Sequence, residues 1–399
     1  MQDISLEQAV RVLLAHTNEV RESESVEIID ALGRTLAEDC MAAFDNPPFD
    51  RSPLDGYAFA AAGTDGASAA KPAVFRIIGE ECAGDYYEQE VPAGCAIRIM
   101  TGGAIPAGCD CVVRQESVIV RVGVLQVPFP MKSHENYCFA GEDVRKGTLL
   151  AGKGTRLTAA HLGVLAGLGY GEVRVIRRVR VAIASTGDEL LQPGMPLQPG
   201  KIYNSNLYIL AGRLRELGFE PKILGILPDD VEACAKIIRS WQDKVDLFLT
   251  TGGVSVGKKD IMHGVVSAIG DRLFWRVCMK PGGPAIAYTF GHTLGIALSG
   301  NPFASYATFE LMARPVLAKL SDHAACELVR AQAVLTDRFP KASHGRRFIR
   351  AYHENGKVRL PEQHASGSLA SVVGCNAFID IPAGTGPLEP GTEVDIVLL

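Results

Sequence analysis

The sequence predicts a multidomain α/β protein, and three observations support that prediction. A chain of 399 residues is longer than one typical domain of about 150 residues, which favours several domains. Residues 173–326 alternate apolar strand patterns with helical patterns, the order typical of an α/β sheet. Residues 45–138 and 327–399 carry short β-type runs separated by Gly and Pro, which indicates two further domains rich in strands.

An amphipathic helix is expected at the start of the chain. Ser5 followed by Gln8 resembles a capping box, and apolar residues recur at helical spacing from Leu6 to Leu14. A second helical piece follows Thr158, a residue type that commonly caps helix N-termini. The two pieces flank the first β-rich segment. The expected domains are therefore a split helical domain, residues 1–44 and 139–172, and a β-rich insert domain, residues 45–138.

Two local features are expected within the insert domain. The segment Val118–Val127 predicts a hairpin that turns near Gly123. Cys109 and Cys111 alternate with Asp110, which favours a strand that shows both sulfur atoms on one face over a pair of metal ligands. No metal is assigned to them.

The region 173–326 is expected to form an α/β domain with a parallel or mixed sheet. Ligands of such domains collect at the carboxyl ends of the strands. The expected strands are Val179–Ala184, Pro221–Ile226 and Val245–Leu249, and the expected helices are Asn204–Leu217, Asp229–Trp241 and Asp260–Ile269. Residues 327–399 then predict a small all-β domain.

Charge and cysteine content limit the class of partner and the compartment. Forty basic and 45 acidic residues give a net charge of −5, which does not favour nucleic acid as a ligand. The ten cysteines lack the spacing of a disulfide scaffold, so we expect reduced thiols in a cytoplasmic protein.

No export signal and no membrane span are expected. Residues 1–5 lack the basic and apolar regions of a signal peptide. The longest stretch without Asp, Glu, Lys or Arg, Pro281–Phe309, is interrupted by glycine and proline into pieces of strand length. This stretch predicts a buried hairpin followed by a helix.

A glycine-rich segment, Leu249–Gly257, comes directly off an apolar strand. Glycines allow backbone N–H groups to approach a ligand, and a following helix N-terminus adds positive potential, so the segment is typical of an anion cradle. An ordinary glycine-rich turn between strand and helix is the equal alternative. The candidate contacts are Thr251, Gly252, Gly253, Ser255 and Gly257.

Acidic residues follow the strands at the same expected edge of the sheet. They are Asp188, Glu189, Asp229, Asp230 and Asp260. Carboxylates beside a phosphate cradle would repel an anionic substrate unless a divalent cation lies between them, which implies Mg²⁺. Taken one at a time, Asp229 or Asp230 and Asp260 are better explained as helix caps, and the joint pattern shifts this weighting towards a cation site.

A third motif, Asn46–Ala58, contains Asp55 followed by glycine, a pair that alone would indicate a turn. With further motifs in the same order, it resembles the MoeA-type molybdopterin molybdenumtransferases, the family that includes the C-terminal domain of gephyrin. The motifs are PPFDRSPLDGYA (47–58), RIMTGGAIPAGCDCVV (98–113), AGEDVRKG (140–147), STGDEL (185–190), GKIYNSN (200–206), TTGGVSVGKKD (250–260) and MKPGGP (279–284).

This resemblance implies both architecture and activity. The family builds an elongated homodimer with a shared active-site cleft from four domains, of which residues 173–326 would bind molybdopterin and residues 327–399 would form a β barrel. Its members take adenylylated molybdopterin and molybdate, release AMP and place molybdenum on the dithiolene sulfurs. The adenylyltransferase of the preceding step is then a further expected partner.

The resemblance also implies roles for individual residues. Asp188 and Glu189 would face the pterin and the inserted metal, with Glu189 as the candidate proton donor, and Asp229 and Asp260 would hold Mg²⁺ or shape the phosphate site. The remaining expected site residues are Asp55, Thr101 and Asp143 from the other subunit, Arg276 and Lys280 for molybdate or phosphate, and Ser371, whose alternative is a flexible polar loop.

Two departures from the family pattern stand out. Gly283 occupies a position where many relatives have lysine, and Ser299 one where they have proline. The lost charge weakens anion binding unless Lys258 or Lys259 replaces it, and Ser299 loosens the turn before the next helix. Two alternatives to molybdenum insertion stay open: a tungstate-handling relative and a non-catalytic molybdopterin-binding scaffold.

Overall fold

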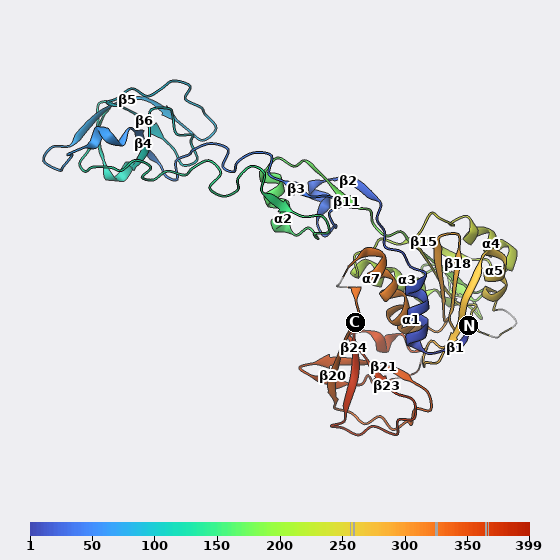
Figure 1. Cartoon of the computed structure of the whole chain (residues 1–399). Helices are drawn as coiled ribbons and strands as arrows, with labels where there is room; N and C mark the ends of the chain where they lie inside the picture. The colour runs from blue at the N-terminus through green and yellow to red at the C-terminus, as the bar shows by residue number, and fades with distance from the viewer. Residues whose placement is uncertain (256, 258–259, 324–325, 364, 366) are drawn as a thin grey trace. The chain divides into compact units, whose positions relative to one another are not determined.

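The computed structural model describes residues 1–255, 257, 260–323, 326–363, 365 and 367–399 (Figure 1). Lys258 and Lys259, and Val256 of the glycine-rich segment, lie outside the described residues. The chain forms two compact units, one of Met1–Arg21 with Arg177–Leu399 and one of Glu22–Ile176. In the described part, no helix is long and apolar enough to cross a membrane.

A mixed sheet forms the centre of the first unit. Four neighbouring strands run parallel, and β18 is antiparallel to both of its neighbours. In spatial order the strands are β1 (Gln2–Ile4), β17 (Asp271–Val277), β18 (Ile286–Phe290), β19 (Thr293–Leu298), β16 (Leu247–Thr251), β12 (Val181–Thr186) and β15 (Lys222–Leu227). The predicted strands and the predicted hairpin within 281–309 are confirmed.

Helices cover both faces of this sheet, with α4 and α5 on one side and α1, α3 and α7 on the other (Figure 1). Buried side chains of α4 and α5, such as Ile238 and Val265, pack with Phe248 and Tyr288 of the sheet. The helices are α1 (Leu6–Ala15), α3 (Ser205–Glu216), α4 (Val231–Arg239), α5 (Met262–Ile269), α6 (Pro302–Thr308) and α7 (Arg314–Ser321), with a π-helical segment Phe309–Ala313 between the last two.

The N-terminal residues differ from the expected domain boundary. The predicted capping box of Ser5 and Gln8 is confirmed, but α1 contacts α7, and β1 pairs in parallel with β17. Residues 1–21 therefore belong to the α/β unit and not to the split helical domain to which the sequence assigned them. The cause is non-local strand pairing, which local patterns do not reveal.

A buried ion cluster fastens α3 to the π-helical segment. The Glu310 carboxylate is fully buried and accepts hydrogen bonds from Arg213 Nε at 2.6 Å and from Arg314 at 3.1 Å. Hydrogen bonds to Glu310 help to raise the pKa of Arg213 above its usual range. The Arg213 guanidinium therefore stays charged beside the carboxylate.

The C-terminal region forms a closed five-stranded barrel, as the resemblance implied. Alternate side chains, among them Leu335, Ile349 and Ile396, fill its interior. The strands in order around the barrel are β20 (Val329–Leu335), β22 (Lys357–Arg359), β21 (Arg347–Glu354), β23 (Ala377–Ile381) and β24 (Glu393–Leu398).

The second unit contains a β-rich part and a smaller helical part. The β-rich part is a sheet of β7 (Cys111–Arg114), β4 (Gly56–Phe59), β6 (Cys95–Ile99), β5 (Ala73–Glu81), β9 (Val124–Val127) and β8 (Ile119–Arg121). The helical part combines α2 (Ala159–Gly167) with the strand pairs β2 (Ser23–Glu27) with β11 (Glu172–Ile176) and β3 (Cys40–Met41) with β10 (Leu149–Ala151). The hairpin of β8 and β9 and the Thr158 cap of α2 are confirmed.

The prediction for the two neighbouring cysteines is wrong. Strand β7 begins at Cys111, so the strand alternation does not reach back to Cys109. Cys111 packs in one core cluster with Phe59 and Phe75, whereas Cys109 packs in another with Val91. Burial raises the pKa of each thiol to about 12. Both thiols are therefore neutral core groups.

Candidate active site

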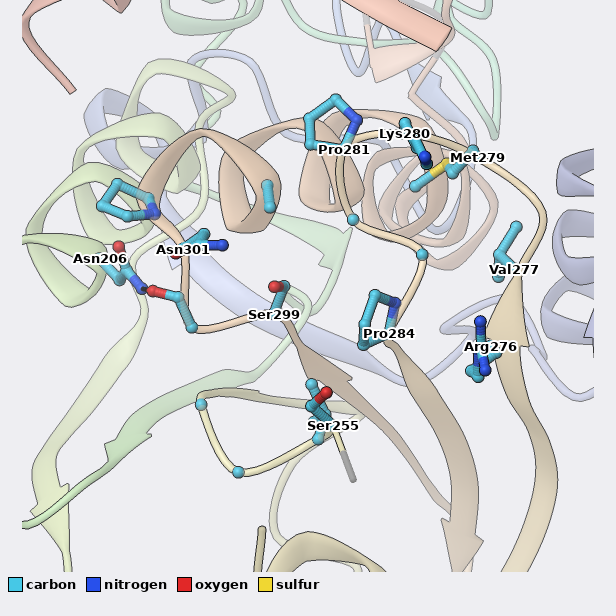
Figure 2. A pocket seen from close by; sticks show the side chains of 18 of the residues that line it. Asn206, Ser255, Arg276, Val277, Met279, Lys280, Pro281, Pro284, Ser299 and Asn301 are labelled. Carbon is cyan, nitrogen blue, oxygen red and sulfur yellow. Dashed lines mark hydrogen bonds between the residues drawn. The ribbon is translucent and has the colours of Figure 1, made fainter. Parts of the chain in front are cut away.

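A large cavity of about 1290 Å³ opens within the first unit. The carboxyl ends of β12, β15, β16 and β19 reach it, so the residues that follow these strands form one wall. Figure 2 shows Ser255, Ser299 and Asn301 of this wall. Arg276, near the end of β17, and Lys280, in the segment that follows, lie around the same cavity. This is the sheet edge at which the sequence placed the chemistry.

The glycine-rich segment is built tightly into this wall. A Cβ atom on Gly252, whose φ is +93°, would lie 2.4 Å from the carbonyl oxygen of Thr186, so only glycine fits. Gly252, Gly253 and Ser255 line the cavity. Thr251 and Gly257 do not: the Thr251 hydroxyl lies 3.0 Å from the buried hydroxyl of Ser185.

Among the acidic residues that line the cavity, three follow strands of the sheet: Glu189 after β12, Asp229 after β15 and Asp260 after β16. Asp3, Asp380 and Asp395 also line it. Asp260 accepts a hydrogen bond from the backbone N–H of Gly257 and so remains in the loop. Helix α5 therefore begins at Met262, two residues later than expected. Asp188 does not line the cavity, and its carbonyl oxygen accepts a hydrogen bond from Lys201.

The two neighbouring acidic residues after β15 have different surroundings: one caps a helix and the other lines the cavity. Asp230 is the N-cap of α4 and accepts a hydrogen bond from the N–H of Ala233 at 2.9 Å. Asp229 is half-buried and lines the cavity. In the described part of the chain, no group of three or more His, Cys, Asp or Glu side chains is arranged to hold a metal ion. Mg²⁺ nevertheless commonly binds to only two protein carboxylates together with substrate phosphate oxygens.

Basic side chains come from the end of β17, from the segment that follows it and from the barrel. Arg276 and Lys280 are exposed and line the cavity, and Arg276 Nε lies 3.2 Å from a carboxylate oxygen of Asp3. The main chain of Lys280 is paired with β21, because its N–H donates to Arg346 O at 2.9 Å and its carbonyl oxygen accepts from Phe348 N at 2.7 Å. The barrel therefore sets the position of this lysine.

The sequence analysis missed two arginines that line the same cavity. Arg346 donates to both carboxylate oxygens of Asp380, at 2.8 and 2.6 Å, and also to Glu7. Arg330 forms an ion pair with Asp380 at 3.0 Å. The hydrogen bond from Arg346 holds the pKa of Glu7 below its ordinary value. No local motif reveals these residues, since only the closed barrel brings them to the cavity.

A smaller cavity of about 270 Å³ adjoins Lys280 on its barrel side. Its charged lining residues within the described part of the chain are all cations: Lys280, Lys341 and Arg347. The rest of the described wall is apolar, with Phe303, Phe339, Phe348, Pro281 and Ile349. The Arg347 guanidinium lies 5.6 Å from the centre of the Phe339 ring. An oxyanion would find positive charge here without a competing carboxylate.

Ser371 lies apart from the large cavity. It belongs to the short 3₁₀ segment Ala370–Val372, and its hydroxyl donates to the carbonyl oxygen of Ser368 at 2.9 Å. It does not appear among the lining residues of the cavity. The structure therefore does not bring Ser371 to the wall of the large cavity.

The remaining expected site residues belong to the unit Glu22–Ile176. Asp55 accepts hydrogen bonds from the N–H and the hydroxyl of Thr101, both at 2.8 Å, and these bonds hold its pKa below the ordinary value of 3.8. Asp143 accepts a hydrogen bond from Asn46 Nδ2 at 2.9 Å. Asp55 and Thr101 are therefore direct neighbours within this unit.

Comparisons with known proteins cover nearly the whole chain. Family models match residues 4–169 (MoeA N-terminal region, domains I and II), 182–319 (probable molybdopterin binding domain) and 332–399 (MoeA C-terminal region, domain IV). A relative from Bacillus subtilis, named molybdopterin molybdenumtransferase, is 38% identical over 409 residues, which cover 99% of this chain and 94% of the relative. The chain belongs to the MoeA family of molybdopterin molybdenumtransferases.

Other relatives and solved structures agree with this assignment. A Haemophilus influenzae relative of the same name is 32% identical, with 98% of both chains covered. The crystal structure of a MoeA molybdopterin biosynthesis protein from Pyrococcus horikoshii aligns with a TM-score of 0.82 at 30% identity, covering 99% of both chains. A second MoeA structure from P. horikoshii OT3 aligns with a TM-score of 0.72 at 32% identity, covering 100% of both chains.

Both departures from the MoeA pattern lie on the cavity wall. Gly283 and Ser299 each line the cavity. A Cβ atom on Gly283 would lie 3.1 Å from Met279 O and 3.2 Å from Val277 O, which is tight but open to small adjustments. The departures therefore change the surface that a substrate meets and leave the three carboxylates in place.

Proposed function

We propose that this chain inserts molybdenum from molybdate into adenylylated molybdopterin and releases AMP. One observation carries the proposal: a single cavity brings together the carboxylates that follow β12, β15 and β16, a glycine-built backbone wall and several basic side chains. Hydrolysis of a phosphoanhydride and binding of an oxyanion need these groups together. The cavity volume of about 1290 Å³ suits a substrate with two heterocycles.

Asp229 and Asp260 are the proposed magnesium ligands, together with substrate phosphate oxygens. When bound, Mg²⁺ supplies charge neutralisation at the phosphoanhydride. At Gly252 and Gly253, the absence of side chains lets the protein backbone approach the substrate closely. Arg276 and Lys280 then stabilise the negative charge on the departing AMP.

Molybdate is the second substrate, and Lys280 is its proposed first contact. The cation-lined smaller cavity next to this lysine supports binding of an oxyanion there. During insertion, molybdate gains two thiolate ligands and loses oxo groups, and each oxo group leaves as water after it takes up two protons. Glu189 is the proposed proton donor because it lines the cavity.

The proposed active form is a cytoplasmic homodimer with a shared cleft. The side chain of Glu189 is exposed in the single chain, whereas a proton donor works best in a shielded pocket. We therefore assign Asp55, Thr101 and Asp143 to the cover of the site, contributed by the partner subunit. Ten free cysteines are consistent with a reducing compartment. The adenylyltransferase of the preceding step is the proposed supplier of substrate.

The deciding experiment incubates the purified protein with adenylylated molybdopterin, Mg²⁺ and molybdate. We expect AMP release that depends on the oxyanion, together with molybdenum bound to the product. Tight binding without AMP release would identify a scaffold and contradict the proposal. A parallel reaction with tungstate shows whether the site prefers one oxyanion, because the two ions share charge and shape.

A further inference from the structure

A buried acid in the second unit has no assigned role. Glu81 is the last residue of β5 and is 1% exposed. Neither of its carboxylate oxygens has a hydrogen-bond partner of normal geometry in the described part of the chain. Buried polar groups nearly always have such partners, and an ionised carboxylate without one is costly.

The segment that carries Thr101 lies directly against this acid. The carbonyl oxygen of Glu81 accepts a hydrogen bond from Met100 N at 3.1 Å. The N–H groups of Tyr87 and Ala104 face the carboxyl group and lower its pKa, but burial raises the pKa more, and the charge of Asp85 adds to the rise. The charge of Glu81 also contributes to the raised pKa of the nearby Cys109 thiol, which is neutral.

The same segment is held on its other side by residue 52. Gly102 N donates to Ser52 O at 2.8 Å, and Ser52 N donates to Gly103 O at 2.9 Å. Between these contacts, Thr101 makes its two hydrogen bonds to Asp55. Any change in packing against Glu81 therefore reaches the Thr101–Asp55 pair through a few residues of one short turn.

We propose that Glu81 is a positioning residue for Thr101: its protonated carboxyl group packs against residues 100–104 and keeps Thr101 on Asp55, and loss of the proton loosens this segment. The link to catalysis rests on the proposed function, in which Thr101 and Asp55 act in the shared cleft. The link to Thr101 itself does not depend on that function.

The sign of the pH effect follows from the raised pKa. In the opened segment Glu81 titrates near its ordinary value of 4.5, and in the closed segment it titrates higher. Opening therefore becomes easier as the pH rises from 4.5 to the closed-state pKa, about tenfold per pH unit, and is constant above it. A Glu81→Gln variant, which mimics the protonated form, loses this dependence.

Hydrogen exchange of the full chain tests the proposal directly. We expect the protection factor of the Thr101 amide, which corrects for intrinsic base catalysis, to fall with pH in the native chain and to stay constant in Glu81→Gln. Glu81→Leu, which has no ionisable group, should also be constant if Gln perturbs folding. Glu80→Gln is the matched control, since Glu80 is 49% exposed and pairs with Arg98, and it should follow the native chain.

Equal pH slopes in the native chain and Glu81→Gln would overturn the proposal. If the pH slope of protection differs between the two proteins at amides next to Glu81 but not at the Thr101 amide, Glu81 is only a core residue and the positioning role is wrong. In the AMP-release reaction, the ratio of kcat between Glu81→Gln and the native chain should rise over the same pH range, with little change in KM. Absence of AMP release from both proteins would contradict the proposed function and leave the exchange result decisive for Glu81.

Discussion

Asp229 lines the large cavity, whereas its neighbour Asp230 accepts a hydrogen bond from Ala233 N at 2.9 Å and caps helix α4. Two adjacent carboxylates thus have different tasks. One lies on the cavity wall, and the other satisfies a backbone donor at a helix end. The pair offers a matched test of the proposed magnesium site.

Replacing Asp229 by Ala is expected to raise the Mg²⁺ concentration needed for AMP release by at least about tenfold, since even outer-shell partners of a metal contribute 10-fold or more. Asp230→Ala should instead lower the free energy of unfolding by about 1 kcal/mol and keep the Mg²⁺ requirement. Magnesium titrations of AMP release and denaturant unfolding measure both effects. Equal Mg²⁺ requirements in the two variants would remove Asp229 from the site.

Glu189→Gln is expected to slow molybdenum insertion by about 100-fold, because the amide keeps the shape of the side chain but cannot donate a proton to a departing oxo group. Asp188→Asn should have a smaller effect, since Asp188 does not line the cavity. Molybdenum bound to product, measured per turnover of AMP, reports the step. Undiminished insertion by Glu189→Gln would eliminate Glu189 as the donor.

Thr101→Val removes the hydroxyl bond to Asp55 and keeps the backbone bond. The pKa of Asp55, now below 3.8, should rise towards that value, as seen in an NMR titration of its carboxyl carbon. Because the folded-state pKa is lowered, this contribution to stability is present above pH 3.8 and is lost as the pH falls through the lowered pKa. Thr101→Val should make that loss smaller. An unchanged Asp55 titration would mean that the hydroxyl bond has no effect.

Gly283→Lys restores the charge that the MoeA pattern leads us to expect. We expect molybdate to bind about fivefold more tightly, equivalent to about 1 kcal/mol for an added ion pair. Gly283→Ala is the control, because its Cβ meets the same carbonyl oxygens at 3.1 and 3.2 Å but carries no charge. Calorimetric titration with molybdate distinguishes the two variants. Tighter binding by both would attribute the gain to backbone ordering.

Glu310→Gln is expected to lower the free energy of unfolding by about 3–5 kcal/mol, since Arg314 would stay buried without its carboxylate partner and Arg213 would lose its buried one. Glu216 also pairs with Arg213 but is exposed, so Glu216→Gln should cost less than about 1 kcal/mol. Denaturant unfolding of the two variants measures the difference. Similar costs would show that the buried cluster contributes little.

Local patterns predicted much of the fold because local chemistry decides those elements. The Ser5 capping box, the Thr158 cap and the strands that end at Thr186 and Thr251 all follow from residue type and spacing. The same reasoning placed Glu189, Asp229 and Asp260 at one sheet edge, because parallel strands end at the same side.

Other features depended on contacts between distant residues. Thr251 and Gly257 belong to the expected segment, but neither lines the cavity. The Thr251 hydroxyl lies against the Ser185 hydroxyl, and the Gly257 N–H donates to Asp260. Arg346 reaches the cavity only through the pairing of the barrel with Lys280. Composition and periodicity do not show which distant residues pair, so these details needed the three-dimensional structure.

The pairing of β1 with β17 also bears on how the chain folds as it leaves the ribosome. Gln2 lies opposite Trp275, so β1 stays unpaired during synthesis until β17 has been made. Residues 22–176 are contiguous and can mature earlier. Such long-range closure slows folding, and β1 stays open to chaperones throughout that interval.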